Sequence, residues 1–182
     1  MKKLFFLLTL LMPFLSFNCH KDDDFGLPPA TQNGANTFGC MINGKPWVAE
    51  IAPNILDPAL RKLDMSYDET LTGAFYNNTF SLFARLVNDT TSQSVVVSGF
   101  KLEKTGLLDT ASNSLSITYR LHSPFLKTYE IDKNLPSRFE ITKLDTLANI
   151  CSGRFEFYVI SSDKADTLFI TEGRFDKRYA PE

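Results

Sequence analysis

The stretch Ser114-Leu115-Ser116-Ile117-Thr118-Tyr119-Arg120-Leu121 decides the fold class. Polar and apolar side chains alternate from its first residue to its last, so that one face of the segment is apolar and the other is polar. Successive side chains of a β-strand point to opposite faces of a sheet, so this period of two predicts a half-buried strand.

Strand patterns continue on both sides of this stretch, and turn signals separate them at short intervals. Asn43-Gly44 is the strongest hairpin signal in the chain. One short helix is predicted over residues 57–62, with Asp57 at the N-cap and Pro58 at the first helical position. Further strands are predicted over residues 37–42, 45–48, 79–86, 95–97, 138–144, 151–159 and 168–179.

The pattern as a whole predicts an all-β fold. About eight or nine strands with short connections are typical of an antiparallel β-sandwich or β-barrel. Periodicity does not choose between the two architectures.

Length and charge restrict the class of protein. The chain has 182 residues and a formal net charge of −2, and 164 residues remain without residues 1–18. That length can form a hydrophobic core without metals or many disulfides. The sequence has no basic stripe of the kind that nucleic-acid-binding proteins carry, so no nucleic-acid partner is expected.

The first 18 residues have the layout of an export signal. Lys2 and Lys3 precede an apolar stretch, residues 4–15, which is too short to span a bilayer as a helix. Residues 1–18 are therefore predicted to be a signal peptide. A membrane anchor that stays attached is the alternative.

Cys19 follows this leader directly. Residues 15–19 resemble a lipoprotein signal, in which the cysteine thiol receives diacylglycerol before cleavage, although Asn18 stands where a small residue is usual. Cys19 is therefore predicted to be lipidated and to begin the mature protein. An ordinary secretory signal is the alternative.

An acidic run comes next in the chain. Lys21, Asp22, Asp23 and Asp24 resemble the export signal that directs Bacteroidota lipoproteins to the outer cell surface. A solvated acidic run is the alternative. Residues 19–36 contain prolines and glycines and show no regular period, so they are predicted to be a flexible tether. Residues 37–182 are predicted to form a single all-β domain.

Both ends of the mature chain resemble one family. Residues 27–47 resemble the opening of a family of Bacteroidota lipoproteins of unknown function, and residues 141–145, 151–157 and 170–176 resemble its ending. The resemblance implies an all-β domain at the cell surface. It carries over no catalytic residue.

No catalytic motif is visible in the sequence. A histidine base would have to be His122, because His20, the other histidine, lies in the predicted tether. His122 precedes Ser123-Pro124 and is interpreted as a loop residue rather than a catalyst. The chain has no nucleophile elbow, phosphate-binding glycine loop or zinc-ligand spacing. We therefore predict no catalytic residue, no metal and no cofactor.

Two cysteines remain once Cys19 is lipidated. Cys40 and Cys151 both lie in predicted strands. An exported protein meets oxidising conditions, in which the pair could form a disulfide. Buried free thiols are the alternative, and the sequence does not decide between them.

Four Asp-Thr pairs are candidates for O-glycosylation. Thr90, Thr110, Thr146 and Thr167 each follow an aspartate and precede a small or apolar residue or a threonine, which resembles the Bacteroidota O-glycosylation sequence. Turn-forming Asp-Thr pairs would give the same pattern.

These features predict a lipid-anchored protein of the outer membrane that faces the cell exterior. Its expected partners are the membrane, through the anchor, and a glycan, a lipid or another envelope protein. A non-enzymatic binding or interaction domain is the main hypothesis. The alternatives are an envelope-anchored hydrolase with a site formed only in the fold, and a purely structural envelope protein.

Overall fold

The computed structural model describes residues 25–72, 75–100, 105–108, 115–123 and 126–179. The predicted signal peptide (residues 1–18), Cys19, the run from Lys21 to Asp24, and Thr110 lie outside the described residues. The strands of the described part are β1 (Thr37–Ile42), β2 (Lys45–Val48), β3 (Glu50–Ile51), β4 (Leu63–Thr72), β5 (Phe75–Val87), β6 (Ser92–Phe100), β7 (Gly106–Leu108), β8 (Leu115–Ser123), β9 (Lys127–Ile131), β10 (Arg138–Asp145), β11 (Ile150–Ser161) and β12 (Thr167–Arg178).

The all-β prediction is confirmed. The described part contains twelve strands, more than the eight or nine expected, because β4 and the short strands β3, β7 and β9 were not foreseen. The part of the alternating stretch that the structure describes, residues 115–121, lies in β8, with Leu115, Ile117 and Tyr119 buried and the residues between them more exposed.

The helix predicted over residues 57–62 is wrong. Asp57 accepts a hydrogen bond from the Ala59 N–H (2.9 Å), as an N-cap would, but the chain makes a single turn. The carbonyl of Lys62 already accepts a hydrogen bond from the Arg85 N–H in β5 (2.8 Å). Pairing with β5 therefore begins too soon after Asp57 for a helix to continue.

The strands form one sheet that is nearly closed into a barrel. Its order is β2-β1-β12-β11-β9-β8-β6-β5-β3, with β4 beside β5 and β10 beside β11. Ala49, the residue between β2 and β3, donates a hydrogen bond to the carbonyl of Phe38 in β1 (3.0 Å). Residues 45–51 thus pair with β1 at one end and with β5 at the other, which brings the two ends of the sheet together.

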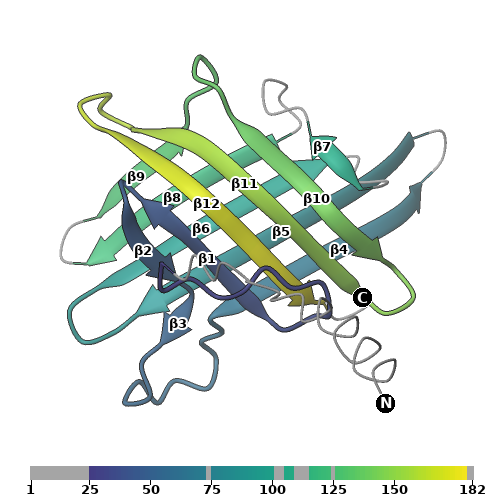
Figure 1. The fold of residues 1–182 in the computed structure, drawn as a ribbon, viewed down its shortest axis with the longest axis horizontal. Helices are drawn as coiled ribbons and strands as arrows, with labels where there is room; N and C mark the ends of the chain where they lie inside the picture. The colour runs from purple at the N-terminus through teal and green to yellow at the C-terminus, as the bar shows by residue number, and fades with distance from the viewer. Residues whose placement is uncertain (1–24, 73–74, 101–104, 109–114, 124–125, 180–182) are drawn as a thin grey trace, which may run out of the picture.

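The barrel is flattened into two layers. Figure 1 shows β10, β11 and β12 in front, with β4, β5, β6 and β8 running across them behind. Neighbouring strands are antiparallel except β3 and β5, which pair in parallel. The side chains between the layers form the core.

Aromatic rings fill the interior. Phe155 lies near the centre, with ring centroids 5.2 Å from Phe38, 6.1 Å from Phe139 and 5.3 Å from Phe157. All four phenylalanines are at least nine-tenths buried. Because cores of this kind pack as densely as organic crystals, the interior leaves little room for a ligand.

A polar side chain links the edge strand β2 to the opposite part of the barrel. The Oε1 atom of Gln93 in β6 accepts hydrogen bonds from Nε1 of Trp47 (2.7 Å) and the hydroxyl of Tyr119 (2.8 Å). Both aromatic residues are buried, and each has its polar atom satisfied in this way. The contact holds β2 against β6 and β8 and helps to close the barrel.

Candidate functional site

Residues 25–36 lie along the outer face of the sheet and are called the strap below. The prediction of a flexible tether is wrong for these residues. Leu27 is buried, and the side chain of Pro28 packs so closely on Gly39 in β1 that an added Cβ would lie 2.6 Å from its Cδ. Nε of Arg174 in β12 donates a hydrogen bond to the carbonyl of Pro28 (2.6 Å). Figure 1 shows the strap in dark purple, passing in front of the end of β12.

The strap is fixed by one carboxylate, Asp176 of β12. Asp176 is only 1% exposed and accepts five hydrogen bonds. The donors are the hydroxyls of Thr31 (2.6 Å) and Ser152 (2.8 Å) and the backbone N–H groups of Asn33 (3.0 Å), Gly34 (2.9 Å) and Ala35 (3.0 Å). One side chain therefore satisfies three consecutive backbone donors of a segment that belongs to no sheet.

Asp176 stays charged in this setting. Burial alone would raise the pKa of its carboxyl, but the hydrogen bonds from Thr31, Ala35 and Ser152 outweigh burial and lower the pKa below its ordinary value. Hydrogen bonds to an ionised acceptor are stronger than those to a neutral one. The charge therefore strengthens the attachment of the strap.

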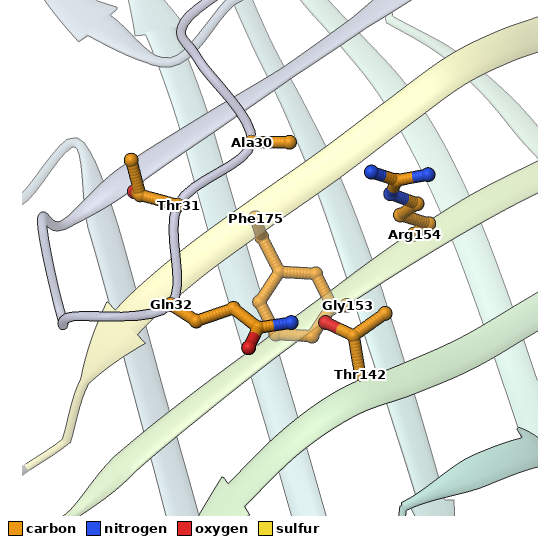
Figure 2. A pocket seen from close by; sticks show the side chains of 7 residues that line it. All are labelled: Ala30, Thr31, Gln32, Thr142, Gly153, Arg154 and Phe175. Carbon is orange, nitrogen blue, oxygen red and sulfur yellow. The ribbon is translucent and has the colours of Figure 1, made fainter.

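A shallow hollow of about 20 Å³ lies between the strap and the sheet. Figure 2 shows the amide of Gln32 and the side chain of Thr142 facing one another across it, near the ring of Phe175. A space of this size holds about one water molecule. The hollow is therefore a packing gap beside the strap and is too small for an organic ligand.

The interpretation of His122 as a loop residue is wrong, because His122 lies in β8. It is the extra residue of a bulge opposite Ser92 and Gln93 in β6. Its Nε2 lies 2.9 Å from Oγ of Ser94, which is completely buried. A serine without access to solvent cannot meet a substrate, so the pair links β6 to β8 rather than forming a nucleophile and base.

A second polar cluster joins β9 to the turn before β12. Asp166 accepts hydrogen bonds from the hydroxyl of Tyr129 (2.8 Å) and Nζ of Lys127 (3.1 Å). The hydrogen bond from Tyr129 and then that from Lys127 lower the pKa of Asp166. Within the described residues, no group of three or more histidine, cysteine or acidic side chains could hold a metal ion.

Cys40 and Cys151 are both free and buried. Cys40 lies on β1 and Cys151 on β11, and β12 runs between these strands. Two strand spacings amount to about 10 Å, whereas a disulfide needs Cα atoms within about 7 Å. The structure therefore contains two buried free thiols, which was the alternative to a disulfide. Burial, and then the nearby charge of Asp176, raises the pKa of Cys151 to about 12.

Thiol labelling checks this assignment. We expect residues 19–182, with Cys19 replaced by serine, to react with less than about 0.1 equivalent of Ellman's reagent when folded, because only thiolates react and burial opposes ionisation. After unfolding in guanidinium without reductant, Cys40 and Cys151 should both react. No reaction after unfolding would mean that the two form a disulfide.

The candidate glycosylation sites that the structure describes are exposed. Thr90 lies in the turn between β5 and β6, Thr146 in the turn between β10 and β11, and Thr167 begins β12. The hydroxyl of Thr90 donates to Oδ1 of Asn88 (3.0 Å). Asp145 next to Thr146 accepts a hydrogen bond from the Ala148 N–H (2.9 Å), a turn contact that explains one Asp-Thr pair without modification.

Comparisons of the chain with protein-family models, with curated proteins and with solved structures found no match. Among the described residues, no helix is long and apolar enough to cross a membrane.

Proposed function

We propose that the chain is an outer-membrane lipoprotein, acylated at Cys19 and facing the cell exterior, whose β domain is a non-enzymatic binding or interaction module. The strap is the observation that supports this best. Cys19 lies six residues before Phe25, the first residue that the structure describes. An acyl chain on Cys19 would therefore hold the folded domain through a very short linker.

The attachment of the strap suits a segment that joins a lipid anchor to the folded domain. A lipid anchor joined to a loose segment would leave the domain free to move far from the membrane. Here residues 25–36 are held by four hydrogen bonds to Asp176 and by the hydrogen bond from Arg174 to Pro28. These contacts join residues 25–36 directly to β12.

The packed interior favours binding through the outer surface. Rings such as Phe139 and Phe157, both 0% exposed, occupy the space that a ligand would need in a barrel that binds lipid inside. A glycan, a lipid headgroup or another envelope protein could still meet the outer face or the turns. A hydrolase that used Ser94 and His122 as nucleophile and base would need an accessible serine, and Ser94 is buried.

Metabolic labelling with an alkyne fatty acid tests the anchor. In a bacterial host that makes lipoproteins, the wild-type chain and a Cys40→Ala variant should take up the label, whereas Cys19→Ala should lose it. The thiol of Cys19 is the acceptor in this proposal, and Cys40 is buried. Label retained by Cys19→Ala would overturn the proposed anchor.

A second variant tests export to the outer cell surface separately from lipid attachment. Replacing Asp22, Asp23 and Asp24 by alanine should leave the lipid label in place but reduce digestion of the protein by protease added to whole cells. Equal digestion of the variant and the wild type would show that these three aspartates do not act as an export signal.

A further inference from the structure

The strap begins beside β2 and ends beside the end of β12. At its start, Gly26 lies beside Pro46 of β2, where an added Cβ would be 3.9 Å from Cβ of the proline. Towards its end, Gly34 lies against Ile150 and Arg178, with an added Cβ within 3.3 Å of both side chains. The start of the strap is therefore beside the turn between β1 and β2, and its end is beside the turn between β10 and β11.

The surface near the start of the strap carries aromatic side chains. Phe25 is 56% exposed. Tyr158 in β11 and Phe169 in β12 are opposite one another, and their rings stack with centroids 4.2 Å apart. Both are partly exposed, whereas their neighbours Phe157 and Ile170 are completely buried, so the stacked pair lies on the outer face.

The stacked pair lies close to the β1–β2 turn. Asn43 in that turn donates its N–H to the carbonyl of Phe169 (2.8 Å), and its side chain accepts from the Phe169 N–H (2.8 Å). Pro46, beside which the strap begins, is only three residues further along the chain. We call Phe25, Pro46, Tyr158 and Phe169 the anchor-side patch.

The length of chain between Cys19 and Phe25 limits how far this patch can lie from the membrane. The six residue steps from Cys19 to Phe25 span at most about 20 Å when fully extended. A lipid on Cys19 therefore keeps Phe25 within about 20 Å of the headgroups, and aromatic side chains are favoured at that interface. The link to Cys19 sets no comparable limit on the far end of the sheet, which contains the turn between β10 and β11.

We propose that the anchor-side patch faces the lipid bilayer and contacts its headgroup region, so that the far end of the barrel points away from the membrane. The proposal rests on the acylation of Cys19 under the proposed function. Leu147, in the turn between β10 and β11, is 97% exposed and belongs to the far end. Arg178 comes nine residues after Phe169 in β12, which corresponds to about 30 Å along the strand.

Quenching by brominated phospholipids tests this orientation. The acylated protein would be purified as the wild type, Phe25→Trp and Leu147→Trp, and each would be placed in phosphatidylcholine vesicles with or without bromine on the upper acyl chain. We expect bromine to lower the emission of the Phe25→Trp variant about two-fold relative to the wild type, because its indole would lie at the interface. Leu147→Trp should match the wild type, whose Trp47 is buried.

Each outcome is decisive because vesicle flotation and intact mass accompany the measurement. Equal quenching of the two variants, or stronger quenching of Leu147→Trp, in protein that floats and carries lipid would overturn the orientation and leave the anchor intact. Protein without lipid that does not float would overturn the proposed function and this orientation with it.

Discussion

Asp176→Asn is expected to lower the free energy of unfolding by about 3 kcal/mol. The asparagine has the same shape, but it loses the charge and turns an N–H₂ group towards donors that need an acceptor. The donors from Thr31, Gly34 and their neighbours in the strap, together with Ser152, would then share one neutral oxygen. Urea unfolding followed by circular dichroism measures the effect as a lower midpoint with little change in slope.

Asp132→Asn is the matched control for this substitution. Asp132 accepts a hydrogen bond from the Asn134 N–H (2.9 Å) in an exposed turn, and an asparagine can accept the same bond. Its cost should be below about 0.5 kcal/mol. Equal midpoints for Asp176→Asn, Asp132→Asn and the wild type would show that the carboxylate does not hold the strap.

Gly173→Ala is expected to destabilise the domain by about 3 kcal/mol through overpacking. Gly173 in β12 faces Phe155 in β11, and a Cβ at this position would overlap with the phenylalanine ring. The backbone of Gly173 is not in the left-handed region, so the cost is steric. Because Phe155 packs against Phe38, Phe139 and Phe157, the ring cannot move without disturbing the core.

A double-mutant cycle isolates this clash. In a Phe155→Leu background the smaller side chain leaves room for the methyl group, so Gly173→Ala should cost less than half as much as it does in the wild type. Gly44→Ala serves as a control for backbone effects, since its Cβ would meet open space but its φ is +76°. It should cost about 1 kcal/mol. An unchanged cost of Gly173→Ala in the Phe155→Leu background would contradict the clash.

The fold class was readable from the sequence because alternation is a local property. β8 has its buried residues where the period of two predicts them. β4 was missed although its start has the same pattern, with Leu63, Met65 and Tyr67 buried and the intervening residues exposed. That strand could have been predicted, whereas β7 is too short to show a period.

Barrel closure could not be read from the sequence. It depends on residues 45–51 pairing first with β1 and then with β5, and the change occurs at the single residue Ala49. Which strands become neighbours is a question of long-range packing. Patterns along one strand contain no information about it.

The strap was mistaken for a tether because its fixed structure comes from a distant residue. Thr31 and Asp176 are 145 positions apart in the chain. Prolines, glycines and asparagines without a period are typical of flexible segments, and the carboxylate that binds the strap is not nearby.

The most direct test of the strap is amide hydrogen exchange of Asn33, Gly34 and Ala35 in the folded wild-type domain. Their N–H groups bind Asp176, so NMR should find them protected by at least about 100-fold relative to an unstructured peptide. Protection should be lost at these residues in Asp176→Asn while the core strands keep theirs. Exchange at the rate of an unstructured peptide in the wild type would contradict the account, because residues 25–36 would then be the flexible tether that the sequence suggested.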